Sequence, residues 1–228
     1  MLKIYGAPIS VHTRKAIIVA NLKNVPYEVV PVVPVAPPSF PPNWRTLSPT
    51  GLIPVMVDGA RSLPDSTAIC MYLDRTHPEH PVYPDDPGAL AEVLSLEAYA
   101  GDRLFRAVVR VLFSEVVIGP KIKEQPTNPS VVSETLNVTV PEVFGFLDRA
   151  ADRGYLVGAQ LSMADIAVVS NLINFHYCGF DMGVRYPALR ALYDRLLAQG
   201  AVRQALEAER PFADSLGLNR DGVQSRAA

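Results

Sequence analysis

The sequence predicts an α/β half followed by an all-helical half. Short β-rich runs alternate with helical patterns in the first part of the chain, and only helical periodicity follows from Ala89 onward. Between them lies the proline-rich stretch HPEHPVYPDDPG, residues 77–88. This change of pattern predicts a domain boundary, with one domain over residues 1–80 and a second over residues 87–218.

The first half begins with a strand, a helix and a strand. Leu2–Tyr5 and Tyr27–Val33 predict strands, and Val11–Lys23 predicts a buried helix. Because such a connection joins parallel neighbours, we expect a parallel pair with a right-handed crossover. Six prolines between Pro31 and Pro42 then predict extended, semi-rigid chain, and a short turn follows over residues 43–47.

A hairpin and a helix complete this half. Ile53–Val57 and Arg61–Leu63 predict two short strands, and the Asp58-Gly59 pair between them is a strong signal for a hairpin turn. The pattern over Asp65–Thr76 predicts a helix.

The second half contains only helical patterns. We expect one long helix from Ala89 to about Gly119-Pro120, another from Pro129 to Asp152, a third after Ser162, and two more after Tyr186 and near Ala201. The polar tail from Gly217 is expected to fray.

The composition is that of an ordinary globular protein. The 228 residues are 49% hydrophobic and 19% charged, with a formal net charge of -2. This balance argues against nucleic acid or an anionic membrane as a partner. The N-terminus has no apolar signal region and no membrane-length apolar run occurs, so we expect a cytoplasmic protein.

The cysteines and histidines predict no redox or metal centre. Cys70 and Cys178 lie far apart in apolar helical contexts, which predicts buried, inert thiols. His77 and His80 are three residues apart, and the prolines Pro78 and Pro81 forbid a shared helix face, so no metal site is expected there.

Four groups of residues in this order resemble the soluble glutathione transferase family, serine-type and bacterial-looking, over nearly the whole chain. They are Ser10 with Arg14, Ile53-Pro54, Asp65-Ser66, and the run Ser162-Met163-Ala164-Asp165. The resemblance implies a thioredoxin-like N-terminal domain, an all-α C-terminal domain, glutathione as co-substrate, a small electrophilic acceptor and a homodimer, with a role in detoxification.

The resemblance implies that Pro54 is a cis-proline. The backbone of Ile53 would then face outward and pair with the cysteinyl part of glutathione, as an added strand does. A proline at the edge of a sheet is the alternative when the residue is taken alone.

Asp65 and Ser66 stand at the start of a predicted helix. Either residue type is common as an N-cap, and the free N–H groups there also suit a carboxylate. The resemblance implies that Ser66 holds the γ-glutamyl carboxylate and that Asp65 pairs with the ammonium group. The two interpretations are compatible.

Ser10, which follows the first predicted strand, is the candidate activating residue. It would donate a hydrogen bond to the thiolate of glutathione and would not act as a nucleophile. Thr13 and Tyr5 are the rivals, and a purely capping role for Ser10 is compatible with catalysis. Arg14 has either a structural role or a contact with ligand, and His12 is interpreted as solvated or lining the cleft.

Two positions depart from the family pattern. Leu52 stands where relatives often carry glutamine, which removes a polar contact worth about 0.5–1.5 kcal/mol. Arg45, next to the proline-rich stretch, could replace a contact to the glycyl carboxylate.

The run from Ser162 to Asp165 is a capping box with a structural role.

The helical half offers candidates for the acceptor side. Tyr99, Arg103, Arg106 and Arg110 share a helix face, which is either a solvated or dimer-contacting face or a positive wall for an acceptor. His176 and Tyr177 are candidates for the acceptor pocket.

The sequence therefore predicts an enzyme, a glutathione transferase that activates the thiol for attack on an electrophile. The alternative is a non-catalytic binding or scaffold protein of the same fold, which Leu52 and the proline-rich stretch favour. A thiol–disulfide oxidoreductase is a minor third possibility, because no cysteine lies near Ser10.

Overall fold

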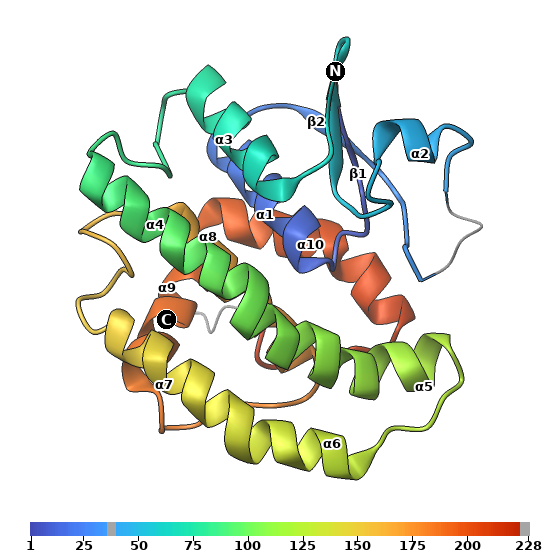
Figure 1. Cartoon of the computed structure of the whole chain (residues 1–228), viewed down its shortest axis with the longest axis vertical. Coiled ribbons are helices and arrows are strands. Elements are labelled where there is room, and N and C mark those ends of the chain that lie inside the picture. The colour runs from blue at the N-terminus through green and yellow to red at the C-terminus, as the bar shows by residue number, and fades with distance from the viewer. Residues whose placement is uncertain (36–39, 224–228) are drawn as a thin grey trace. The chain divides into compact units, whose positions relative to one another are not determined.

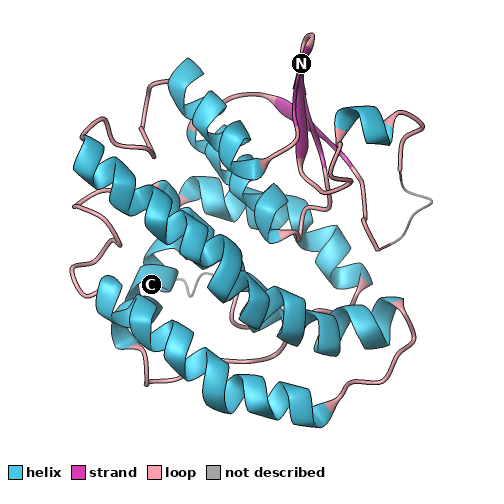
Figure 2. Cartoon of the chain, viewed as in Figure 1, coloured by secondary structure: helices cyan, strands magenta, loops and turns pink. Residues whose placement is uncertain are grey.

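The computed structural model describes residues 1–35 and 40–223, which divide into two units. The first unit holds Met1–Val82 together with Gly200–Phe212, and the second holds Tyr83–Gln199 and the chain from Ala213. Parts of the predicted proline-rich extended stretch (36–39) and of the predicted frayed tail (224–228) lie outside the described residues. The predicted fold class is confirmed, and all strands of the described residues lie in the first unit (Figure 1, Figure 2).

The first unit is built on a four-stranded sheet in the order β2-β1-β3-β4. β1 and β2 are parallel, as predicted, and β3 is antiparallel to both β1 and β4. Helices α1 and α3 pack against each other on one side of the sheet, and α2 lies on the other (Figure 1). The bounds are β1 Leu2–Tyr5, α1 Val11–Leu22, β2 Tyr27–Val30, α2 Trp44–Leu47, β3 Val55–Asp58, β4 Arg61–Leu63, α3 Ser66–Thr76 and α10 Gly200–Ser215, of which the residues from Ala213 belong to the second unit.

Prolines shorten two of the predicted strands. β2 ends at Val30 because Pro31 has no N–H to donate, and β3 begins at Val55, directly after Pro54. The hairpin is confirmed, but its turn lies one residue later than predicted. Asp58 pairs with Arg61, so Gly59 (φ 58°) and Ala60 form the loop.

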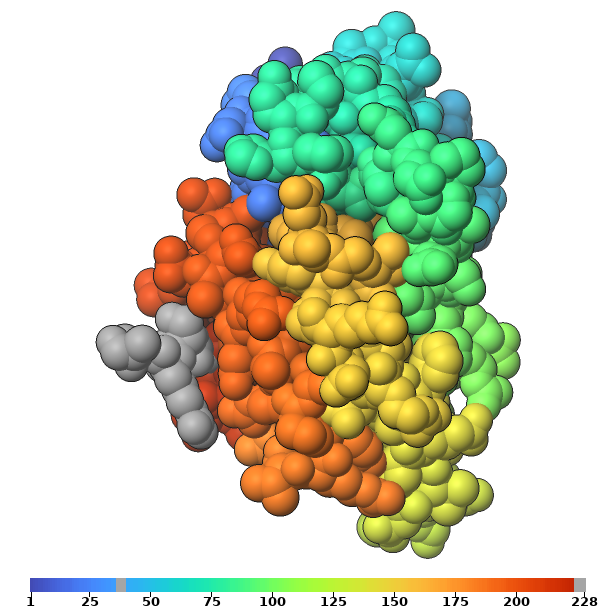
Figure 3. All heavy atoms as spheres, turned by 90° about the vertical axis from the view of Figure 1, so that its left-hand side faces the viewer, coloured from blue at the N-terminus to red at the C-terminus, as the bar shows by residue number. Residues whose placement is uncertain are grey.

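The second unit packs around α8, whose fifteen residues from Met163 to Tyr177 are all buried. The predicted long helix is continuous but contains stretches of π-helical hydrogen bonding, a geometry that the apolar pattern does not signal. Helices α7 and α9 pack side by side on the surface of the second unit (Figure 3). The bounds are α4 Pro87–Tyr99, η2 Ala100–Leu104, η3 Arg106–Ile118, α5 Gly119–Ile122, α6 Pro129–Glu134, η4 Thr135–Thr139, α7 Val140–Ala150, α8 Met163–Tyr177 and α9 Pro187–Leu197.

Local signals in the second unit gave one correct and one wrong prediction. The Ser162 N–H and hydroxyl both donate to Asp165 Oδ2, at 2.8 and 2.7 Å, which confirms the capping box. The tail is not frayed at residues 217–223, because the Tyr193 hydroxyl donates to the Gly222 carbonyl at 2.7 Å and Val223 is buried. Cys70 and Cys178 are buried and form no disulfide within the described residues, and burial raises the pKa of the Cys178 thiol to about 12.

Candidate functional site

Ser10 lies at the N-cap position of α1 with an extended backbone (φ −68°, ψ 128°). Its carbonyl accepts the Arg14 N–H at 2.8 Å, and its own N–H donates to the Ala7 carbonyl at 2.9 Å. The Ser10 hydroxyl makes no capping hydrogen bond and is partly exposed. The side chain is therefore free to donate to a ligand at the helix N-terminus.

Arg14 is completely buried and holds the loop that carries Ser10. Its Nε and Nη2 donate to the two carboxylate oxygens of Glu209 on α10, at 2.9 and 3.0 Å. Nη2 also donates to the Ile9 carbonyl at 3.2 Å. Of the two roles predicted for Arg14, this geometry favours the structural one.

The rival activators Thr13 and Tyr5 contact other residues of the first unit, and the buried Thr13 hydroxyl has no hydrogen-bond partner among the described residues. The Thr13 side chain is buried against Gly6, where any Cβ would clash with its hydroxyl. Tyr5 packs against Trp44, with ring centroids 6.5 Å apart. Its ring belongs to an apolar cluster on the side of the sheet that α2 covers.

The Ile53–Pro54 peptide bond is cis, as the resemblance implied. Just before it, the Leu52 N–H donates to Thr50 Oγ1 at 3.3 Å, and the Leu52 carbonyl accepts from Ser48 Oγ at 2.7 Å. The Leu52 side chain, which replaces the glutamine of relatives, is 58% exposed. The loop is thus fixed through the backbone of Leu52, and its side chain contributes no polar group.

The N-terminus of α3 is capped by Asp65, whose Oδ1 accepts the Ala68 N–H at 2.9 Å. Ser66 follows as the first helical residue and is buried. Its hydroxyl lies 3.5 Å from His12 Nδ1, in the first turn of α1. This contact brings the turn that follows Ser10 next to Ser66.

The contact between His12 and Ser66 is one that the sequence did not predict. His12 was interpreted as solvated or lining the cleft, and the structure places it, partly buried, beside Ser66. The only signal available was its spacing two residues after Ser10.

Arg45 lies on the exposed face of α2, above Gly51. A Cβ at Gly51 would come within 2.9 Å of Arg45 Nη1, and the φ of Gly51 is +74°. Trp44 anchors this region, since its Nε1 donates to the Gly51 carbonyl at 3.3 Å and its ring stacks on Phe40. The guanidinium is therefore held beside the loop that leads to Pro54.

The basic face of the long helix is paired with acids. Arg103 donates to Glu142 at 2.7 Å and Arg106 to Asp102 at 2.6 Å, and all four side chains are at least half exposed. This pairing favours a solvated face over a positive wall. His176 and Tyr177 are both buried near the end of α8.

Two family models match the chain. The model of the glutathione S-transferase N-terminal domain matches residues 4–81, and that of the C-terminal domain matches residues 114–209. The chain belongs to the glutathione S-transferase family. Glutathione is the co-substrate of this family.

The relatives of this glutathione S-transferase family member are distant but span its length. A glutathione S-transferase of Triticum aestivum is 28% identical over 216 residues, which cover 93% of this chain and 96% of the relative. Glutathione S-transferase theta-1 of Mus musculus is 28% identical over 205 residues, or 87% of this chain and 83% of the relative. The structure of a glutathione S-transferase from Sinorhizobium meliloti 1021 has a TM-score of 0.87 at 21% identity, covering 100% of both chains, and shows the shared fold.

Membrane-spanning helices and metal-binding clusters are both absent from the described residues. Within residues 1–35 and 40–223, no helix combines the length and the apolar character needed to cross a bilayer. In the same part of the chain, no group of three or more His, Cys, Asp or Glu side chains could hold a metal ion.

Proposed function

We propose that this protein is a serine-type glutathione transferase, which binds glutathione in the domain predicted over residues 1–80. The domain predicted over residues 87–218 selects a small electrophile. The family resemblance further supports a homodimer acting in the cytoplasm.

The observation that carries the proposal is the Ser10 hydroxyl, which stands at the N-terminus of α1 and makes no capping bond. A thiol of pKa about 8.5 must be stabilised as the thiolate by about 2.7 kcal/mol to lower that pKa by about two units. A hydroxyl donated to an anion supplies about 1.5–3 kcal/mol, and the helix N-terminus supplies about 0.3–1 kcal/mol. The two together are sufficient, whereas the helix alone is not.

The remaining contacts follow the three parts of glutathione. The backbone of Ile53 pairs with the cysteinyl part. Among the described residues, no other group forms a hydrogen bond with the N–H or carbonyl of Ile53. Ser66 receives the γ-glutamyl carboxylate, and the exposed carboxylate of Asp65 receives the ammonium group. Arg45 reaches the glycyl carboxylate. This contact replaces part of the binding energy that is lost because Leu52 has no polar side-chain group.

Calorimetric titration with glutathione tests the binding half. Ser66→Ala should weaken glutathione about tenfold or more, because a hydrogen bond to a charged group is removed. Ser62→Ala, on an exposed strand residue, is the matched control and should leave the affinity unchanged. No binding of glutathione at about 10 mM would contradict the proposal.

Thiolate absorbance against pH tests the catalytic half. Ser10→Ala should raise the pKa of bound glutathione by about 1–2 units while leaving its affinity largely intact. Tyr5→Phe and Thr13→Val are the controls and should not move that pKa. Glutathione binding with the pKa of the free thiol would instead identify a non-catalytic binding protein.

A further inference from the structure

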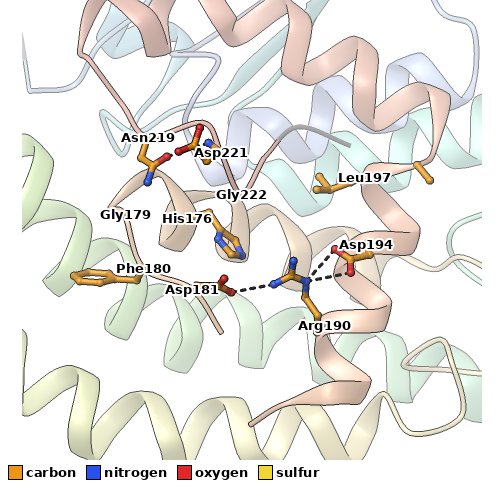
Figure 4. Close-up of a pocket in the computed structure, with 11 residues that line it drawn as sticks. His176, Gly179, Phe180, Asp181, Arg190, Asp194, Leu197, Asn219, Asp221 and Gly222 are labelled. Atoms are coloured by element: carbon orange, nitrogen blue, oxygen red, sulfur yellow. Dashed lines mark hydrogen bonds and ion pairs between the residues drawn. The ribbon is translucent and has the colours of Figure 1, made fainter. Parts of the chain in front are cut away.

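A cavity of about 360 Å³ lies within the second unit, and none of the residues proposed to bind glutathione lines it (Figure 4). Its walls are the turn after α8, one face of α9 and the segment that follows α10. A volume of this size falls in the range of small-molecule sites.

His176 gives the cavity a buried polar group with an unused bonding capacity. The residue is 4% exposed, and its Nε2 has no hydrogen-bond partner among the described residues. Burial lowers the pKa of the imidazole, so the ring is neutral at neutral pH. Buried polar atoms in native proteins are almost always bonded, so this unpartnered Nε2, on a residue that lines the cavity, indicates a missing partner.

The ring of His176 is held in place from two sides. It packs on Tyr193, with centroids 4.7 Å apart, and any Cβ at Gly222 would clash with its Nδ1. Tyr193 in turn donates its hydroxyl to the Gly222 carbonyl at 2.7 Å. The cavity wall is therefore shaped by specific packing.

The cavity carries an excess of negative charge. Among the described residues that line it, Asp181, Asp194 and Asp221 stand beside a single guanidinium, that of Arg190. Arg190 Nη1 is 2.9 Å from Asp181 and its Nε is 3.0 Å from Asp194. Asp221 has no ion-pair partner in residues 1–35 and 40–223, and Figure 4 shows it on the opposite side of His176 from Asp181.

The shape and lining favour an organic cation over a metal ion. The described side chains form no three-ligand metal group, and the cavity is far larger than one ion. Its wall is also partly apolar, with Phe180, Leu197 and Ala198. We propose that this cavity binds an aliphatic diamine or polyamine, with one ammonium group at Asp221, the other at Asp181 and Asp194, and the methylene chain along the apolar residues. This site is independent of the proposed function.

Calorimetric titration of the full chain at low ionic strength tests this, with putrescine as the probe and 1,4-butanediol as its uncharged counterpart. Putrescine should bind and butanediol should not. Asp221→Asn should weaken putrescine about tenfold or more, because a charge-assisted hydrogen bond is removed. Asp152→Asn removes the same charge from an exposed residue of this unit and should change the affinity less than about twofold.

A second readout is the ring-proton NMR signals of His176, identified with His176→Gln, which should shift on addition of putrescine. No heat with putrescine at about 10 mM would overturn the proposal, as would equal losses in the Asp221 and Asp152 variants. Asp221→Asn should bind glutathione as the wild type does. Loss of glutathione binding in the wild type with putrescine binding retained would refute the proposed function alone.

Discussion

Two serines begin helices in this protein, and the structure uses them differently. Ser162 begins α8, and both its N–H and its hydroxyl donate to the buried carboxylate of Asp165. Ser10 begins α1, and its hydroxyl makes no capping bond. The same residue type in the same position is therefore committed to the fold in one unit and left available for a ligand in the other.

The helix start that lacks its own cap is held from elsewhere. Arg14 binds the carbonyl of Ile9, one residue before Ser10, and Arg14 is bound by Glu209. The positioning of Ser10 thus rests on a buried ion pair, which leaves its hydroxyl unused. A serine at an N-cap position whose hydroxyl does not cap the helix is therefore a candidate for binding a ligand.

Breaking this anchor should have the largest effect. Glu209→Gln leaves Arg14 buried without its countercharge, and removing one partner of a buried pair costs about 3–5 kcal/mol of unfolding free energy. The two side chains are only 0% and 1% exposed, so water cannot compensate. Urea unfolding measures the loss.

Glu207→Gln is the matched control, because it lies on the same helix in an exposed pair with Arg210 at 3.2 Å. Exposed pairs contribute little, so this variant should unfold like the wild type. Equal stability of the Glu209 and Glu207 variants would mean that the Ser10 loop is held by other contacts.

Alanine substitutions at the two serines should lower the unfolding free energy less than Glu209→Gln does. The difference between the two losses distinguishes the capping serine from the one whose hydroxyl is unused. Ser162→Ala removes a buried cap and should lower the unfolding free energy by about 0.5–2 kcal/mol. Ser10→Ala removes no capping bond and should change it by less than about 0.5 kcal/mol. The urea midpoints of the two variants decide this, and equal losses would show that Ser10 is an ordinary cap.

The sequence predicted what local signals determine. The strand positions, the Asp-Gly hairpin and the capping box at Ser162 depend on neighbours a few residues apart, and the structure confirms them with shifts of a few residues. The proline effects at Pro31 and Pro54 were also available, because a missing N–H ends a strand wherever it falls.

Contacts between distant segments could not be predicted in this way. Glu209 is 195 residues from Arg14, and nothing in the pattern of α10 marks it as a partner. The meeting of His12 and Ser66 depends on how α1 packs against α3. The order at Gly222 depends on the Tyr193 hydroxyl, which no local pattern of a polar tail reveals.

Acidification acts on the unit that Ser162 stabilises. α8 ends near His176, whose pKa is lowered by burial, with Asp181 and Asp194 opposing and Arg190 adding to the shift. Because the unfolded chain then binds the proton first, stability should fall as the pH drops below about 6.5, by at most about 1.4 kcal/mol per pH unit. The measurement is urea unfolding of the wild type and His176→Gln between about pH 7.5 and pH 5. The wild type should lose more stability than the variant across this window, whereas parallel curves would show that His176 takes up its proton equally in both states.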